Sequence, residues 1–555
     1  MAQNFLKKSL NLLLARQANI LSAAFIIMAT VILSQILGLF RTRLLFSIFG
    51  PSNILGIYDY ASILPDTIFQ LTIAAALASA FIPVFSEFLS KGQEDQAHKL
   101  ASTLLTTGLL IFIIFSVIVI IFAHPILAMF NAGHNFSSSD MNLMANLMTI
   151  IIIGQLIYII GTFFSAMLQS YSHFFIPGIA AAFYNVGIII GILLFHQYFG
   201  IYAAPLGIIL GATIYVVLQI PLAKKVGFSF TPSISFLRSH GLDKILLLMW
   251  PRTIQIGVQQ IGTIILAAII SFMPQPGRTN LLFDAAQTLT FAPVSLIGLS
   301  IAQAAFPILS REKNDLVDFK TTFITSFNQM LYLILPVSAL VLVLRIPIVR
   351  LVYGATKFDW PATVETGYLL AVLAFSIFAQ ALVALFYRAF YALHDSFVPL
   401  FISTISTAIL IILAYYFVVI QKMNIESVAF AFTLSNIIQL LILVVILDRR
   451  VGGFSKSSLF FPGFKIFIAT LLTGISLYIP IKLLDQLVFD TTHTVNLILL
   501  TGISSLIGLS FYLFLTWLFN VKEAGAFLLI FKKIGNWREI LGKSDEAIDG
   551  SHVSP

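Results

Sequence analysis

Charged and amide side chains recur at helical spacing inside segments that are otherwise apolar enough for a lipid bilayer. Two of these side chains are the arginines Arg41 and Arg252. Burying a cation at membrane depth costs at least ~2.5 kcal/mol, so each arginine either reaches the surface or faces a wet cavity and binds an anion. Arginine suits phosphate, because its planar guanidinium group donates two parallel hydrogen bonds. The sequence therefore predicts a cavity that binds a phosphate-containing group.

Four apolar segments carry polar stripes, each with the spacing of one helical face. In chain order the stripes are Ser34, Gly38 and Arg41, with Gln35 beside them; Asp59, Ser62, Asp66 and Gln70; Arg252, Gln255 and Gln259; and Asp284, Gln287, Thr288 and Ser295. We assign substrate binding to Arg41, Arg252, Gln35, Gln255, Gln259, Gln287 and Thr288. We expect three carboxylates to pair with the arginines in the empty site or to carry a coupling ion, namely Asp59, Asp66 and Asp284.

A structural role stays open for any single member of the stripes. Asp59 with Arg41, or Asp284 with Arg252, would then form an ion pair between packed helices. The four-stripe pattern as a whole favours function, because polar stripes that face lipid are too costly.

Other motifs in the apolar segments have structural explanations. Arg43 points away from the first stripe and is expected at the membrane interface, and Arg388 is expected to snorkel to the inner surface. Both arginines are therefore secondary candidates for the site. Glycine pairs at 187–191 and 207–211 have the spacing that allows close helix packing.

The composition identifies a polytopic membrane protein. The 555 residues are 59% hydrophobic and 10% charged, whereas soluble domains are about 45–50% apolar and about 25% charged. The chain has no cysteine, which excludes disulfides and cysteine-ligated metals. We attribute the net charge of +8 to membrane topology and anionic lipid rather than to nucleic acid. The apolar stretch after Asn19 is too long for a cleaved signal peptide.

Fourteen segments are predicted to span the bilayer, which requires about twenty mostly apolar residues each. Their approximate bounds are 19–48, 55–86, 99–123, 144–170, 175–196, 201–223, 245–273, 281–309, 319–344, 364–392, 397–419, 425–447, 464–485 and 495–520. The predicted fold is therefore an all-α polytopic membrane protein. Most of the 31 lysines and arginines fall in connections on the side of the N-terminus, so both termini are expected in the cytoplasm.

The chain repeats itself at an offset of about 224 residues. The sequence ASAFIPVFS ending at Ser86 resembles AQAAFPILS ending at Ser310, and Asp59 corresponds to Asp284. Six spans separate equivalent positions, so the two halves share one orientation, and transporters of this kind bind their substrate between the halves. The predicted parts are an N-lobe at 1–223, a C-lobe at 224–447, two further spans at 448–520, and an amphipathic helix with a polar tail at 521–555.

Three segments carry a family resemblance. They are LSQILGLFRTRLLFSIFG at 33–50, APVSLIGLSIAQAAFPILS at 292–310 and YRAFYALHDSFVPL at 387–400. They resemble the MurJ/MviN lipid II flippase family of the multidrug/oligosaccharidyl-lipid/polysaccharide exporter superfamily. The resemblance implies a transporter that moves lipid II, a polyprenyl-pyrophosphate-linked saccharide, across the bacterial cytoplasmic membrane by alternating access. It also implies that the last two spans form a groove for the lipid tail.

The chain departs from the family pattern in its cavity. Gln35 and Thr42 stand where the family has arginine and aspartate, and Gln287 or Thr288 replaces another arginine. We expect Arg252 to supply part of the missing charge. The coupling-ion ligands of the family are therefore not transferred to this chain.

Three alternatives stay open. The first is export of another polyprenyl-linked saccharide. The second is a membrane glycosyltransferase or ligase, although the sequence shows no catalytic constellation, metal motif or P-loop, and the connection at 124–143 is small for such an enzyme. The third is a scaffold for cell-wall enzymes. For the flippase we expect no cofactor, with Na⁺, H⁺ or the membrane potential as the driving force. The expected partners are lipid II, membrane lipids and cell-wall synthesis enzymes, and we expect a monomer.

Overall fold

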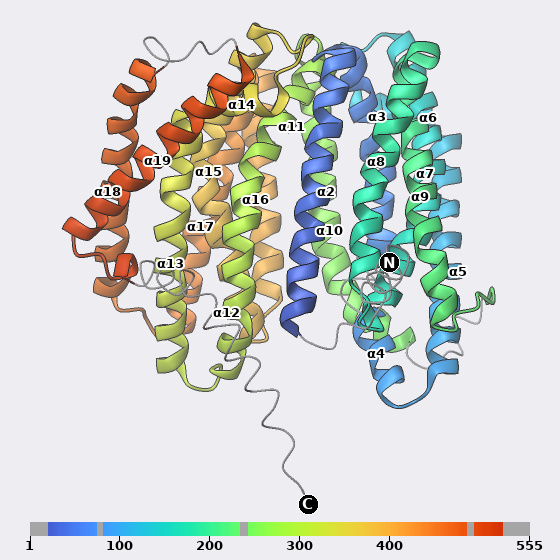
Figure 1. Cartoon of the computed structure of the whole chain (residues 1–555), viewed down its shortest axis with the longest axis horizontal. Helices are drawn as coiled ribbons and strands as arrows, with labels where there is room; N and C mark the ends of the chain where they lie inside the picture. The colour runs from blue at the N-terminus through green and yellow to red at the C-terminus, as the bar shows by residue number, and fades with distance from the viewer. Residues whose placement is uncertain (1–19, 75–80, 234–241, 485–492, 526–555) are drawn as a thin grey trace, which may run out of the picture. The chain divides into compact units, whose positions relative to one another are not determined.

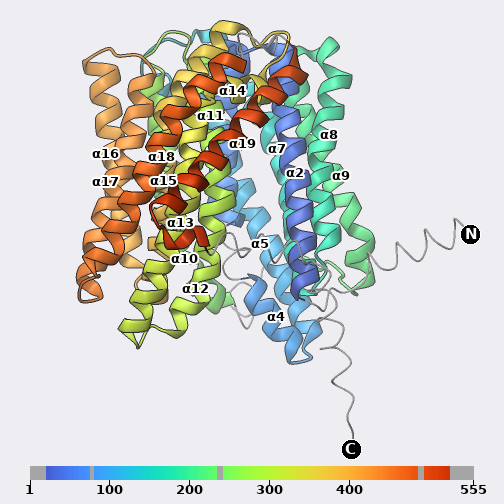
Figure 2. The ribbon, with the colours of Figure 1, turned by 60° about the vertical axis from the view of Figure 1, so that its left-hand side comes forward.

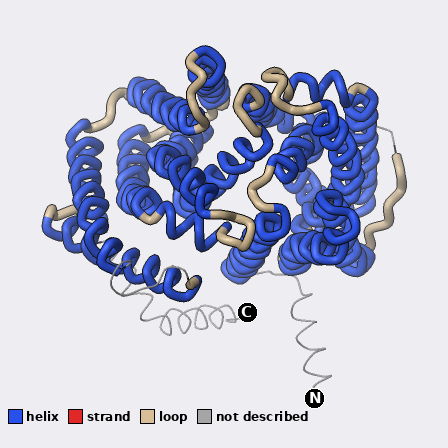
Figure 3. The backbone as a smooth tube through the Cα atoms, turned by 90° about the horizontal axis from the view of Figure 1, so that it is seen from above, coloured by secondary structure: helices blue, strands red, loops and turns tan. Residues whose placement is uncertain are grey.

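The computed structural model describes residues 20–74, 81–233, 242–484 and 493–525. Within these ranges, the side chains of 20–25, 73–74, 242–252, 456 and 458–459 are also outside the described set. Helices make up all the regular secondary structure of the described residues, and Figure 3 shows them joined by loops. The predicted amphipathic helix after residue 525 lies outside the described residues.

The helices keep the labels of Figure 1. They are α2 (Ile20–Phe49), α3 (Asn53–Phe69), α4 (Ile82–Ser90), α5 (Glu94–Ile121), α6 (Ala123–Phe130), α7 (Ser138–Ser170), α8 (Phe175–Phe199), α9 (Ala203–Lys225), α10 (Leu242–Ile270), α11 (Pro276–Pro293), α12 (Ser300–Arg311), α13 (Leu316–Val343), α14 (Arg345–Tyr353), α15 (Trp360–Ala392), α16 (Phe397–Tyr415), α17 (Glu426–Arg450), α18 (Lys456–Leu483) and α19 (Thr494–Leu518). Short π- and 3₁₀-helical stretches adjoin them: η1 (Gln70–Ala74), η3 (Gly200–Tyr202), η4 (Val294–Leu299) and η5 (Tyr416–Ile420).

Twelve helical stretches of the described residues are long and apolar enough to cross a membrane. One of these stretches, Phe175–Lys225, contains both α8 and α9. The predicted span at 55–86 is absent from the twelve, because α3, η1 and α4 divide it and residues 75–80 are outside the described set. The chain is thus an all-helical, multi-pass membrane protein, and the count of fourteen spans stays a prediction.

The order of elements repeats along the chain. The π-helices η1 and η4 begin at Gln70 and Val294, and each comes between a longer helix and a short one. Their spacing matches the predicted offset of about 224 residues. Pro293 directly precedes η4, and proline disturbs a helical ladder because it lacks a backbone N–H. Since π-helical turns occur frequently at functional sites, these paired interruptions are candidate bending points. The boundaries of the two lobes stay a prediction.

The chain divides into two compact units. Unit 1 comprises Met1–Ala286, Val352–Leu369 and Leu400–Ser435, and unit 2 comprises Gln287–Leu351, Leu370–Pro399 and Asn436–Pro555. In unit 1, α2 packs against α8, α8 against α9, and α3 against α7 (Figures 1 and 2). In unit 2, α18 packs between α13 and α19.

Glycine allows α8 and α9 to approach closely. A Cβ atom added at Gly187 would overlap the backbone of Gly211, and one added at Gly191 would overlap that of Gly207. The close packing predicted from the two glycine pairs is therefore confirmed. In unit 2, a hydrogen bond joins α19 to α13, because the Tyr512 hydroxyl donates to the Tyr332 carbonyl at 2.8 Å.

Candidate functional site

Arg41 lies on α2 beside polar and aromatic residues from three other helices of unit 1. Its guanidinium group interacts electrostatically with Asp66 and Tyr58 of α3, with Tyr158 of α7 and with Tyr184 of α8. The rings of Tyr158 and Tyr184 lie 4.8 Å apart. Within the part of the chain that the structure describes, half-buried Arg41 forms no ion pair. The guanidinium group is therefore held inside the unit without direct neutralisation, which is the state that an anion-binding arginine requires.

Asp66 faces other helices rather than lipid. The Gln155 side chain of α7 is buried and donates from Nε2 to Asp66 Oδ1 at 2.5 Å. Asp66 itself is nevertheless exposed, although it lies well inside α3. A carboxylate is costly in hydrocarbon, so we infer that Asp66 borders a surface within unit 1 that water or a polar ligand reaches.

A second polar group joins α3 to α11, also within unit 1. We call this contact the α3–α11 seam, and it comprises Asn53, Gly56, Asp59, Gly277, Asn280 and Asp284. Asn280 is buried and donates from Nδ2 to Asp59 Oδ2 at 2.9 Å and to Asp284 Oδ2 at 3.1 Å. Asn280 therefore bridges the two carboxyl groups.

Backbones approach each other directly at the seam. The Gly277 N–H donates to Asn53 Oδ1 at 3.0 Å, and a Cβ atom added at Gly56 would overlap the backbone of Gly277. One turn further along α3, the Tyr60 hydroxyl donates to the Ala267 carbonyl at 2.9 Å. The seam therefore leaves no room for a side chain at Gly56.

Further polar contacts lie beside the seam, where α10 ends and α11 begins. Before α7, the Gly133 N–H donates to Ser271 Oγ and Asn135 Nδ2 donates to the Ser271 carbonyl, both at 3.0 Å. Arg278 of α11 forms a 2.7 Å ion pair with Glu365. Side-chain contacts thus join five segments of unit 1 in this region, namely α3, α10, α11, α15 and the residues before α7.

Sequence comparison places the chain in a family. The family model described as "Lipid II flippase MurJ" matches residues 45–502, which is well over half of the chain. The chain belongs to the MurJ lipid II flippase family. A relative described as "Probable lipid II flippase MurJ" from Buchnera aphidicola subsp. Schizaphis graminum is 25% identical over 392 residues, which cover 70% of this chain and 76% of the relative. The "Lipid II flippase MurJ" of Burkholderia cenocepacia is 25% identical over 391 residues, covering 69% and 75%.

Solved structures support the same fold. The structure titled "Lipid II flippase MurJ, inward closed conformation" has a TM-score of 0.72 at 22% identity and covers 89% of this chain and 98% of its own. An inward-facing MATE family transporter of the MOP superfamily has a TM-score of 0.62 at 14% identity, with coverage of 76% and 94%. The predicted family is confirmed, and this MurJ protein is a transporter rather than an enzyme.

The carboxylates of this MurJ protein divide between the two polar groups. Asp66 accompanies Arg41, whereas Asp59 accompanies Asp284 in the seam. Among the described residues no ion pair joins Asp59 to Arg41. The correspondence of Asp59 and Asp284 in the repeat stays a prediction, and Asn280 links the two residues in the structure.

The rest of the first stripe faces a neighbouring helix. Asn185 of α8 donates from Nδ2 to Ser34 Oγ at 3.3 Å, and its Oδ1 atom lies 3.8 Å from where a Cβ of Gly38 would be. This face of α2 therefore packs against α8, and of these stripe residues only Arg41 lies near Asp66. Gln35 is exposed.

The remaining predicted binding residues are less closely defined. Arg252 lies in α10 with its side chain outside the described residues, Gln255 is half-buried and Gln259 is exposed. Gln287 and Thr288 belong to unit 2. Their roles stay predictions.

The structure also describes the two secondary candidates for the site, Arg43 and Arg388. Arg43 is half-buried. Arg388 of α15 places its guanidinium carbon 5.6 Å from the centre of the Phe306 ring in unit 2, an arrangement that a cation–π interaction explains.

The sequence reasoning missed several residues that structure the site. Gln155 and Asn280 each hold a carboxyl group, and Tyr58, Tyr158 and Tyr184 surround Arg41. A signal for Gln155 existed, because a lone amide inside an apolar span needs a partner. The tyrosines gave no comparable signal, since tyrosine is common in membrane helices.

Replacing Asp284 tests the polar part of the seam. Asp284→Leu is expected to destabilise the protein by about 1–3 kcal/mol, because buried Asn280 would lose a hydrogen-bond partner. Asp284→Asn is expected to lose much less, since the amide oxygen can still accept from Asn280. Thermal unfolding of the purified variants in one detergent would measure both effects. Equal losses for the two variants would contradict a stabilising hydrogen bond between Asn280 and Asp284.

Proposed function

We propose that this MurJ family member carries lipid II across the membrane by holding its pyrophosphate at Arg41. The observation that carries this proposal is the half-buried guanidinium group near Asp66 and three tyrosines, with no ion pair among the described residues. Arginine forms bidentate bonds with phosphate, and phenol hydroxyls add donors. Asp66 would balance the arginine between transport cycles and be displaced when the pyrophosphate arrives.

Alternating access requires the binding site to be closed toward each side of the membrane in turn. In this proposal the seam forms one of these two closed gates. The predicted topology puts the N-terminal end of α11 and the start of α3 on the outer side of the membrane. A closed seam would therefore keep Arg41 accessible from the cytoplasm, where lipid II is made. Opening the seam would then expose the headgroup to the outer side, in the manner of transporters that rock around a central site.

The rest of the predicted site completes this proposal. Arg252, Gln255 and Gln259 of α10 would contact the headgroup, and the sequence prediction adds Gln287 and Thr288. The last two spans would guide the lipid tail. We place the protein in the bacterial inner membrane with both termini in the cytoplasm, acting as a monomer driven by Na⁺, H⁺ or the membrane potential.

A reconstituted transport assay tests the cargo. Proteoliposomes would receive fluorescent lipid II or, in parallel, a polyprenyl-pyrophosphate carrying an unrelated saccharide, and a membrane-impermeant quencher would report the fraction in the outer leaflet. We expect the protein to accelerate lipid II movement and to leave the other lipid unmoved. Movement of the unrelated lipid without lipid II would instead show an exporter of another polyprenyl-linked saccharide.

A further inference from the structure

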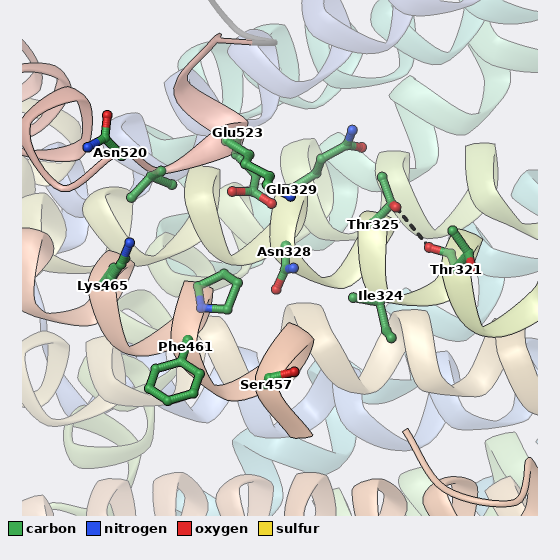
Figure 4. A pocket seen from close by; sticks show the side chains of 13 residues that line it. Thr321, Ile324, Thr325, Asn328, Gln329, Ser457, Phe461, Lys465, Asn520 and Glu523 are labelled. Atoms are coloured by element: carbon green, nitrogen blue, oxygen red, sulfur yellow. Dashed lines mark hydrogen bonds between the residues drawn. The ribbon is translucent and has the colours of Figure 1, made fainter. Parts of the chain in front are cut away.

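A polar cavity of about 650 Å³ lies in unit 2, where α13 and α18 meet the residues that follow α19. Figure 4 shows Lys465 and Asn520 on one side of this cavity and Thr321 and Thr325 on the other.

The cavity carries two cations and one acid. Lys465 donates from Nζ to the Phe519 carbonyl at 2.9 Å, which holds its ammonium group at the end of α19. Lys522 is exposed and, among the described residues, forms no hydrogen bond or ion pair. Glu523 also lines the cavity, and its buried Oε2 atom has no hydrogen-bond partner in the described structure. The cavity therefore has a formal charge of +1 and one carboxylate oxygen that needs a donor.

An apolar cavity adjoins the polar one. It has a volume of about 770 Å³ and shares Ser457 and Phe461 with the polar cavity. Its walls are largely aromatic, with the Phe323 ring 5.0 Å from Phe386 and 5.2 Å from Phe454. A cationic cavity beside an apolar one matches the two chemical halves of a lipid.

We propose that these two cavities bind a phosphatidylglycerol-type lipid, a phosphodiester with one negative charge and a headgroup that carries free hydroxyls. Its phosphate would lie between Lys465 and Lys522, and a glycerol hydroxyl would donate to Glu523 Oε2. One acyl chain would enter the aromatic cavity. The bound lipid braces α18 and α19 against α13.

Charge and donor chemistry select this lipid over its competitors. One negative charge balances the +1 of the polar cavity, whereas a pyrophosphate would exceed it and would favour the bidentate geometry of arginine over lysine. A zwitterionic ethanolamine lipid has no net charge and would leave the +1 unbalanced. Placement in the cytoplasmic leaflet rests on the proposed topology, since the start of α18 is predicted on the inner side.

Native mass spectrometry and thermal unfolding of the full-length protein would test the proposal. The probes are dioleoyl-phosphatidylglycerol, dioleoyl-phosphatidylethanolamine and undecaprenyl pyrophosphate. We expect phosphatidylglycerol to bind most tightly and to raise the unfolding temperature. Lys522→Gln should weaken its binding about tenfold, because one charge-assisted hydrogen bond is lost. Lys522 is the residue of choice, since its side chain supports no other contact among the described residues.

Three further variants separate the effects of the cavity lysine, the Glu523 carboxylate and the aromatic wall. Lys313→Gln is the control, because Lys313 is a half-buried lysine of unit 2 that hydrogen-bonds to His394 and lines neither cavity, and it should leave binding unchanged. Glu523→Gln should shift the preference toward the more highly charged undecaprenyl pyrophosphate. Phe461→Ala should weaken phosphatidylglycerol binding without changing the preference between headgroups.

Several results would overturn the proposal. Equal binding of the glycerol and ethanolamine lipids would exclude selection by charge. Tighter binding of undecaprenyl pyrophosphate to the wild-type protein would make this a cargo site instead. Absence of any lipid binding would indicate that another part of the chain fills the cavities. These measurements do not involve transport, so their failure and the failure of lipid II flipping are distinguishable.

Discussion

Arg41→Ala is expected to abolish growth of a strain in which this protein replaces the resident lipid II flippase. The substitution removes the guanidinium group from its position near Asp66 and leaves an accessible carboxylate in the same interior. Hydrogen bonds to charged groups are typically worth about 1.5–3 kcal/mol, so losing the arginine–phosphate contact corresponds to a loss of about tenfold or more in affinity. The carboxylate would also repel the pyrophosphate. A depletion–complementation assay would measure growth, and immunoblotting of membranes would confirm that the variant inserts.

Neighbouring variants give this experiment its controls. Arg41→Lys keeps the charge but loses the bidentate geometry, so partial growth is expected. Arg43→Ala removes a cation two residues away on another face of α2 and should support nearly normal growth. Arg252→Ala tests the predicted contribution of the second half. Normal growth of both Arg41→Ala and Arg252→Ala would refute the proposed pyrophosphate site.

Gly56→Leu is expected to eliminate transport by holding the α3–α11 seam open. A Cβ atom at this position would overlap the backbone of Gly277, and a backbone cannot rotate away as a flexible side chain can. Overpacking of this kind typically costs about 1–3 kcal/mol and sometimes more, so the closed arrangement would become a minor state. Transport requires both arrangements, which is why loss of one should stop it.

The absence of cysteine from the chain allows a direct measurement of the seam. A cysteine introduced by Ser62→Cys would lie one turn from Asp59 on α3, and a membrane-impermeant maleimide applied from outside would report its accessibility. We expect labelling to increase strongly when Gly56→Leu is added. Gly257→Leu is the matched control in α10 of the same unit, because a Cβ there would meet only the Leu71 Cδ2 atom at 3.6 Å. Normal transport and unchanged labelling of the Gly56→Leu protein would show that the seam is not a gate.

The sequence by itself determined the membrane class and the family. Each of these depends on local composition or on residue spacing, and neither requires knowledge of which helices contact each other. The same holds for the close packing of α8 and α9, since glycine pairs four residues apart present a smooth helical face whatever approaches it.

The tertiary structure decided which side chains meet. Periodicity gives the face on which a residue lies, but the partner depends on how each helix is rotated against its neighbours. For this reason Asp59 binds Asn280 instead of Arg41, and Ser34 packs against Asn185. The two cavities of unit 2 could not be predicted at all, because Thr321, Lys465 and Lys522 are far apart in the sequence and only the packing of α13, α18 and α19 brings them together.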